Sequence, residues 1–332
     1  MNMPVCIETC GAISRDGERW LHERFARILL ATDLCQNSKL ALKFARGIAD
    51  RFGSDLGTLH VFEFGPHGQA VEALDHIPSR ERKIAQRSLE IFNADTGYPG
   101  IAADVVVAET SVTSAIIKFL DERSIDMLVI GTEGMRKGVA HFLLGSKTEA
   151  LMFNSRHLVL AVGRKVLEAS ERRLRFGRVI YVSDFSAASI PAATYAFELA
   201  RAFGVQADLY QIVPEAARNS EAQIADAAAE FCRQLRASNP ALPSAWFDVD
   251  AEISRIVSER DLMAATRESS NLIVLGVQPA SFLRRHVHTS FAYRLLENAA
   301  SPILTVPVDA LTSLFQISEA ATSTGAGTSV TR

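Results

Sequence analysis

The chain has 332 residues and a mass of 36.2 kDa, which at about 150 residues per domain predicts two domains. Its 48% hydrophobic and 22% charged residues are typical of a globular protein and exclude a mostly disordered or collagen-like chain. With 35 basic and 38 acidic residues the net charge is −3, so no overall basic field draws the chain to nucleic acid or to an anionic membrane.

Neither a membrane helix nor a secretory signal is expected. The longest apolar runs, residues 158–163 and 272–277, are far shorter than the ~20 residues that a membrane-spanning helix needs. The first twenty residues carry charged side chains such as Glu8 and Arg15 and lack the apolar segment of a signal peptide. Four cysteines in a chain of this length do not form a disulfide framework. We therefore expect a cytoplasmic protein with neither a membrane nor a nucleic acid as its partner.

Short apolar strands alternate with helical patterns through the first half of the chain. The strands are rich in valine, isoleucine and leucine, which indicates burial on both faces. Alternation of strands and helices predicts a parallel sheet with helices on both faces. We predict strands near residues 27–32, 56–62, 103–108, 126–130 and 158–162, and helices near residues 38–52, 79–94, 112–123 and 146–155.

The first of these helices has recognisable ends. Apolar residues recur every four positions from Leu40 to Phe52, which gives the helix one buried stripe. Asn37 or Ser38 is the predicted N-cap, because both side chains can accept a hydrogen bond from the first turn. Gly53 directly follows the last apolar residue of the stripe, where a helix commonly ends with a glycine in the left-handed conformation.

The chain contains an internal repeat. The apolar strand at residues 28–33 reappears 151 positions later at residues 179–184, and the match continues without a gap through the following helix. Residues 126–131 are matched in the same way by residues 271–276, 145 positions later. A repeat of this length predicts two doubly wound α/β domains in tandem.

The repeat divides the chain into five segments. The two ends and the charged connection between the repeats lack the strand–helix alternation, and the last segment is rich in serine, threonine, alanine and glycine, which predicts a flexible tail. The segments are an N-terminal extension (1–24), a first domain (25–162), a linker (163–176), a second domain (177–309) and the tail (310–332).

Residues suited to phosphate binding gather where strands of the first half end. Asp33 ends the first strand, Gly131 and Gly134 follow the fourth, and Gly145 and Ser146 open the last helix. Ligands of open parallel sheets bind at the carboxyl ends of the strands. Glycines let the backbone approach a ligand closely, and the first N–H groups of a helix attract anions. Asp33 would accept hydrogen bonds from ribose hydroxyls or help to hold a divalent metal such as Mg²⁺.

Together these features resemble the universal stress protein family. The resemblance is carried by the apolar strand that ends in Asp33, by the strand Leu59–Val61, and by the pattern Gly-x-x-Gly followed by Gly-Ser. It covers residues 25–309 as two tandem copies. It implies the strand order 3-2-1-4-5, the ATP binding of many family members, and a pairing of the two halves through their last strands as a pseudo-dimer within the chain. A further homodimer of the whole chain is left open.

The resemblance also assigns roles to particular residues. Asp33 would contact the ribose or a bound metal, and the main chain at Val61 would meet the adenine. It implies no catalytic residue and no dedicated set of metal ligands. The residues that would hold ribose and phosphates are Gly131, Gly134, Gly145, Ser146 and the main-chain N–H of Lys147.

The two halves depart from the family pattern to different degrees. In the first half ten residues, 135–144, separate the glycine pairs where the family has nine, and the carboxylate of Glu133 would repel a triphosphate if it pointed inward. In the second half Pro279 replaces the second glycine and has no N–H to offer, and Thr289 replaces a later glycine. We therefore expect nucleotide in the first half only, with the second half as its structural mate.

Several residues also have purely structural interpretations. Asp33 and its counterpart Asp184 can each cap the turn after a strand, and capping is the favoured interpretation for Asp184. His60 is interpreted as a core histidine with satisfied hydrogen bonds. Cys6 and Cys10, four residues apart without a second pair, are weak evidence for zinc.

The leading hypothesis is an ATP-binding regulatory protein that acts through an unidentified protein partner. The alternative is a scaffold or interaction module that binds no nucleotide, and the ten-residue spacing and Glu133 favour it. A slow ATPase is a third possibility. No base that could activate a water is identifiable beyond Asp33 and Glu133, so fast turnover is not predicted.

Overall fold

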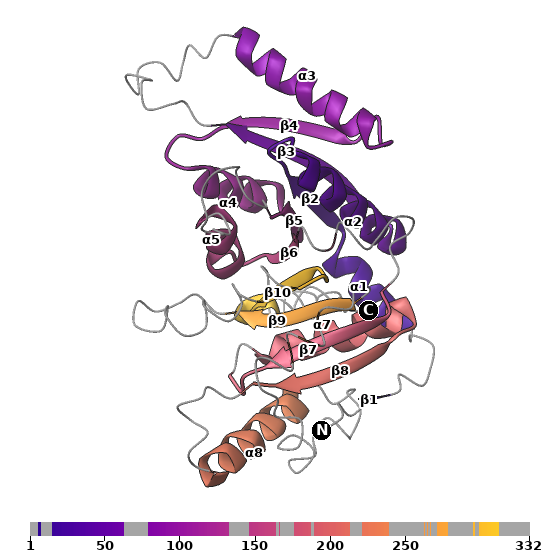
Figure 1. The fold of residues 1–332 in the computed structure, drawn as a ribbon, viewed down its shortest axis with the longest axis vertical. Helices are drawn as coiled ribbons and strands as arrows, with labels where there is room; N and C mark the ends of the chain where they lie inside the picture. Colours follow the sequence, from indigo (N-terminus) through magenta and orange to yellow (C-terminus); the bar gives the residue numbers. More distant parts are fainter. Residues whose placement is uncertain are drawn as a thin grey trace, which may run out of the picture.

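Over the residues that the structure describes, ten strands form one sheet with helices on both faces, as the computed structural model shows (Figure 1). The strand order is β1-β8-β7-β9-β10-β6-β5-β2-β3-β4. The structure describes residues 6–7, 15–62, 79–132, 146–163, 166, 176–186, 189–212, 221–238, 262, 264, 266, 271–277, 295 and 299–311.

The strands and helices predicted for the first half are all present, with bounds within two residues of those predicted. In chain order they are β2 (Arg27–Ala31), α2 (Gln36–Phe52), β3 (Asp55–Phe62), α3 (Ser79–Asp95), β4 (Ala102–Val107), α4 (Val112–Arg123), β5 (Met127–Gly131), α5 (Ser146–Asn154) and β6 (Leu158–Val162).

The first half is a doubly wound sheet. Its five strands are parallel and follow the order β4-β3-β2-β5-β6, which is the predicted order 3-2-1-4-5. Alternate residues of each strand face opposite layers. In β2, Leu30 packs into the core cluster that contains residues of α2 and α3, whereas Leu29 packs into the cluster that contains residues of α4 and α5. The continuous apolar runs are thus explained by burial on both faces.

The second half repeats this arrangement over the strands that the structure describes. The order β8-β7-β9-β10 matches β3-β2-β5-β6 of the first half. Its elements are β7 (Arg178–Ser183), α7 (Ser189–Phe203), β8 (Gln206–Gln211), α8 (Glu221–Ser238), β9 (Asn271–Val277), β10 (Ile303–Pro307) and the 3₁₀ helix η4 (Val308–Leu311).

The two halves meet through their last strands. β6 and β10 pair antiparallel, with Leu160 opposite Leu304 at the centre of the ladder. The Thr305 hydroxyl also donates to the carbonyl of Val159 over 3.3 Å. This is the pairing that the family resemblance implies, and it makes one continuous sheet of the two halves. Beside this seam Arg51 of α2 donates twice to the carbonyl of Ala202 in α7, at 3.0 and 2.7 Å.

The N-terminal extension contains two elements that the sequence analysis did not predict. Strand β1 (Cys6–Ile7) pairs antiparallel with β8 at the far edge of the second half. Helix α1 (Arg15–Arg24) lies between α2 and α7. The Trp20 ring packs 4.9 Å from the ring of Tyr195, and the Phe25 ring, directly after α1, stacks on Phe52 at 5.1 Å. The segment 15–25 therefore joins a helix of each half.

The two ends of α2 differ in how well they were predicted. The helix begins at Gln36 with Cys35 as its N-cap and without a side-chain cap, so the predicted caps Asn37 and Ser38 are wrong. Both side chains bind other groups, described below. At the other end Gly53 has φ of +64° and donates to the carbonyl of Ala49, which confirms the left-handed C-cap.

Candidate functional site

The strand order of the first half reverses direction between β2 and β5, and this place is the switch point of the sheet. The chain leaves β2 for β3 on one side, whereas β5 flanks β2 on the other side, and the helices after these strands cover opposite faces. Such a point leaves a crevice at the carboxyl ends of the strands. Asp33 lies just after β2 and Gly131 ends β5. Helix α5 connects the carboxyl end of β5 to the amino end of the parallel strand β6. Its first residue, Ser146, therefore lies at the carboxyl edge of the sheet.

The turn after β2 fixes the carboxylate of Asp33. Its Oδ1 accepts a hydrogen bond from the N–H of Cys35 at 3.0 Å and another from the hydroxyl of Ser38 at 2.8 Å. One residue earlier, Thr32 Oγ1 accepts from the N–H of Leu34 at 2.9 Å. Leu34 has φ of +65°, a left-handed conformation that costs about 1–2 kcal/mol for a residue with a Cβ. The hydrogen bonds on both sides hold this strained turn in place.

The second half contains the same turn, 151 residues later. Asp184 Oδ1 accepts from the N–H of Ser186 at 3.0 Å and from the hydroxyl of Ser189 at 2.9 Å. Ser183 Oγ accepts from the N–H of Phe185, which has φ of +61°. The capping interpretation of Asp184 is confirmed, and Asp33 caps its own turn in the same way. The turn geometry alone therefore does not separate a ligand-binding aspartate from a structural one.

Gly131 has a structural reason to lack a side chain. A Cβ at this position would lie 3.1 Å from the carbonyl carbon and oxygen of Asn37 and from the nitrogen of Ser38. The first turn of α2 therefore packs directly on the end of β5. The Asn37 side chain also donates to the carbonyl of Thr132 at 3.2 Å, which ties the helix to this strand end. Close approach at Gly131 is thus made by the protein's own backbone.

We expect Gly131→Ala to destabilise the fold by about 1–3 kcal/mol, because the methyl group must displace the backbone of α2. Urea unfolding followed by circular dichroism measures this change. Gly57→Ala is the matched control, since its Cβ would lie 3.4 Å from the flexible end of the Leu29 side chain and 3.8 Å from the carbonyl oxygen of Ala102, both ordinary contact distances. Equal stabilities of the two variants would contradict the close packing described here.

His60 and Val61 lie at the carboxyl end of β3, beside the turn. His60 Nδ1 lies 2.8 Å from the carbonyl of Thr32, and because a carbonyl only accepts, Nδ1 carries the proton. The interpretation of His60 as a histidine with a satisfied hydrogen bond is confirmed, although the residue is half-buried and borders the crevice. Val61 pairs in register with Val106 of β4 and packs against the cluster that contains α4.

Cys35 lies two residues after Asp33, at the start of α2. Burial raises the pKa of the Cys35 thiol, and the adjacent Asp33 carboxylate raises it further. A raised pKa keeps the thiol protonated at neutral pH and lowers its nucleophilicity. The thiol lies 3.6 Å from the hydroxyl of Ser38. Cys35 therefore acts here as a small packing residue at the helix start.

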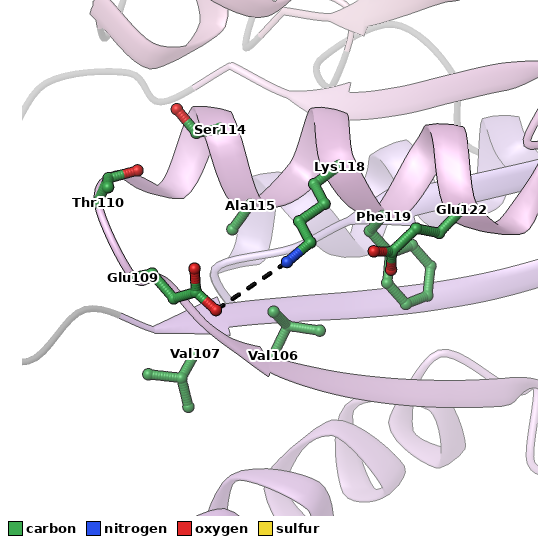
Figure 2. Close-up of a pocket in the computed structure, with 9 residues that line it drawn as sticks. All are labelled: Val106, Val107, Glu109, Thr110, Ser114, Ala115, Lys118, Phe119 and Glu122. Carbon is green, nitrogen blue, oxygen red and sulfur yellow. Dashed lines mark ion pairs between the residues drawn. The ribbon is translucent and has the colours of Figure 1, made fainter. Parts of the chain in front are cut away.

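A cavity of about 160 Å³ lies outside the switch point, between the end of β4 and helix α4 (Figure 2). Within it Lys118 points toward Glu109, with 4.0 Å between Nζ and Oε1, and both side chains are about two-thirds exposed. An ion pair this exposed contributes little stability. The cavity is also smaller than the ~300 Å³ at which ligand pockets begin, so its volume is less than an enclosed nucleotide requires. The lining residues are Val106, Val107, Glu109, Thr110, Ser114, Ala115, Lys118, Phe119 and Glu122.

Part of the predicted site lies outside the described residues. This applies to Gly134 and Gly145, and to Glu133, Pro279 and Thr289, on which the departures from the family pattern rest. Cys10 also lies outside the described residues. For Ser146 and Lys147 the structure gives the backbone, which forms the first turn of α5.

Two classes of feature do not occur in the part of the chain that the structure describes. No group of three or more histidine, cysteine, aspartate or glutamate side chains there is arranged to hold a metal ion. No helix among the described ranges is long and apolar enough to cross a bilayer.

Three polar residues at the switch point were not predicted in these roles: Thr32 was not singled out, and Asn37 and Ser38 were predicted only as helix caps. Thr32 holds the strained turn, Ser38 holds Asp33, and Asn37 binds the end of β5. The repeat contains a signal for two of them, because Ser183 and Ser189 occupy the equivalent positions 151 residues later. A hydroxyl before the aspartate and another five residues after it thus mark the turn in both halves.

Comparison with known proteins gives a consistent result. The model of the universal stress protein family matches residues 24–163 and 175–307. A universal stress protein of Methanocaldococcus jannaschii is 26% identical over 153 residues, which cover 46% of this chain and 87% of the relative. A universal stress protein structure from Archaeoglobus fulgidus aligns with a TM-score of 0.55 at 17% identity, over 86% of this chain and 99% of that one. Another, solved in complex with cAMP, covers 42% of this chain and 97% of its own at 20% identity, with a TM-score of 0.31.

Proposed function

This chain belongs to the universal stress protein family, and on that basis we propose that its first half binds ATP at the switch point between β2 and β5. The observation that carries the proposal is the convergence of three groups at one sheet edge. They are the fixed carboxylate of Asp33, the end of β5 at Gly131, and the first turn of α5.

Each group supplies a different part of the recognition. The carboxylate of Asp33, oriented by Cys35 and Ser38, accepts hydrogen bonds from the ribose hydroxyls. The main-chain N–H groups of Ser146 and Lys147 meet the phosphates at the positive end of the α5 dipole. The main chain of Val61 meets the adenine. Gly134, Gly145 and the backbone at Gly131 complete the phosphate-binding loop.

A divalent metal fits this arrangement only as a companion of the nucleotide. Mg²⁺ is commonly held by one or two carboxylates together with substrate phosphates. Asp33 is a carboxylate of the right kind, and the described residues offer no larger cluster of metal ligands. We therefore assign Mg²⁺ to the phosphates of ATP, with Asp33 as its protein contact. A protein partner would distinguish the ATP-bound from the ATP-free form of the first half.

One observation favours a second candidate function, a scaffold that binds no nucleotide. Asp33 and Asp184 make the same hydrogen bonds, although the second half has Pro279 and Thr289 in its binding loop. In this alternative both turns serve only to join a strand to a helix.

Calorimetric titration of the purified chain with Mg²⁺-ATP distinguishes the two functions. We expect one site per chain, because only the sequence of the first half retains both the Gly-x-x-Gly and the Gly-Ser parts of the pattern. Two sites would overturn the assignment to the first half. An absence of binding heat at several temperatures, with no nucleotide released on denaturing the purified protein, would support the scaffold.

A further inference from the structure

The outer face of helix α3 exposes two large apolar side chains. Ile84 is 56% exposed and Ile91 is 49% exposed, and they are the exposed large hydrophobic residues of the described part of the chain. Seven residues separate them, which is close to two helical turns, so both lie on one face. Leu89 and Phe92 are buried on the opposite face against β4 and its neighbours. Helix α3 thus has apolar side chains on two sides, and among the described residues Leu89 and Phe92 belong to the core whereas Ile84 and Ile91 do not.

Charged residues lie along one side of this exposed apolar stripe, and their sign changes along the helix. Lys83 and Arg87 lie on one flank, and Glu90 follows on the same flank toward the end of the helix. Arg87 and Glu90 form an exposed ion pair within the chain at 3.2 Å. The basic residues precede the acidic one, so the flank changes sign along the helix. A helix with such a sequence of charges complements a copy of itself that runs in the opposite direction.

We propose that the outer face of α3 binds α3 of a second copy of this chain, antiparallel about a two-fold axis beside residues 87 and 88. In this arrangement Ile84 of one copy packs on Ile91 of the other, and this contact occurs twice. Lys83 of one copy also approaches Glu90 of the other. A parallel pairing would place this flank of the two copies on opposite sides of the interface, so that Lys83 and Glu90 would not meet.

The position of α3 leaves room for a second copy. Helix α3 and the edge strand β4 lie at the end of the molecule farthest from the second half (Figure 1). The last strands β6 and β10 are already paired within the chain. A single pair of helices buries less than the ~1,200 Å² at the lower limit of stable interfaces, so the dimer is expected to be weak and dependent on concentration.

Sedimentation equilibrium over a range of concentrations tests the proposal with the full chain. We expect the average mass to rise from 36.2 kDa toward twice that value as concentration increases. Ile84→Glu should raise the dimer dissociation constant about tenfold or more, because it removes an apolar contact that occurs twice. Circular dichroism melting checks that this exposed substitution leaves the fold intact. A wild-type chain that stays monomeric, or a variant that dimerises like wild type, would overturn the proposal.

Charge exchange tests the antiparallel orientation. Lys83→Glu should weaken the dimer, and the double variant Lys83→Glu, Glu90→Lys should restore part of the affinity, because the exchange recreates both ion pairs between the copies although it removes the Arg87–Glu90 pair within each chain. Lys118→Glu is the matched control, since it makes the same charge change at an exposed position on α4. Loss of dimerisation in the double variant to the same extent as in the single variant would contradict the antiparallel arrangement. An equal effect of Lys118→Glu would show that net charge alone is responsible.

Discussion

Replacing Asp33 by alanine is expected to weaken Mg²⁺-ATP binding at least about tenfold. A hydrogen bond to a charged group contributes about 1.5–3 kcal/mol, and every 1.4 kcal/mol is a factor of ten in affinity. Asp33→Ala also removes the acceptor of Cys35 and Ser38, so the loss of affinity includes disorder of the turn. Calorimetric titration measures the dissociation constant.

The repeat supplies a matched control for this variant. Asp184→Ala removes the same two hydrogen bonds from the equivalent turn of the second half. It should lower stability in a comparable way and leave the ATP affinity unchanged. Any effect on affinity that both variants share would then come from general destabilisation.

Asp33→Asn separates the two roles of the side chain. Asparagine retains one oxygen that can accept from Cys35 and Ser38, and it replaces the other oxygen with an N–H donor. The turn should therefore survive, whereas hydrogen bonds from ribose hydroxyls and the contact with Mg²⁺ are lost. An Asp33→Asn variant that binds ATP as tightly as wild type would refute a ligand role for this residue.

The second large effect concerns the joint between the halves. Phe25→Ala is expected to cost about 3–5 kcal/mol, the usual range for a buried phenylalanine. Phe25 is 1% exposed, stacks on Phe52 of α2, and meets Tyr195 of α7 edge to face at 6.2 Å. Its removal empties a space shared by both halves. Urea unfolding gives the change in stability.

Hydrogen exchange distinguishes a residue that couples the two halves from a residue that packs within one half. In Phe25→Ala the amides of both α2 and α7 should exchange faster. Phe92→Ala is the control, because Phe92 is equally buried but lies in α3, within the first half. That variant should accelerate exchange around α3 and leave α7 unchanged. Unchanged exchange of α7 in Phe25→Ala would show that the N-terminal segment does not couple the halves.

The strands and helices were predictable because local patterns determine them. Continuous apolar runs indicated strands buried on both faces, and β2, β5 and β6 appear where such runs occur, whereas β3 and β4 are only partly buried. The internal repeat predicted the second half, and Gly53 predicted the end of α2. Helix α1 was missed because its apolar side chains, Trp20 and Leu21, are few and pack against partners from both halves. Such a helix is stabilised by tertiary contacts that a local pattern does not contain.

The site was predictable in position but not in detail. The sequence placed Asp33 and Gly131 at the ends of β2 and β5, where the structure has them. It attributed the close approach at Gly131 to a ligand, whereas the backbone of Asn37 makes that contact. It also assigned Asn37 and Ser38 as helix caps, but these side chains reach across to Thr132 and Asp33. Both differences arise because residues on separate elements meet only once the sheet has formed.

If ATP binds at the switch point of the first half and not of the second, the two equivalent turns respond differently to the nucleotide. Hydrogen–deuterium exchange with and without saturating Mg²⁺-ATP measures this difference, because the repeat provides equivalent reporters in one molecule. We predict slower exchange at residues 33–38 and 131–132, with no change at residues 184–186 and 189. Equal protection in both halves, or no protection at residues 33–38, would contradict the account.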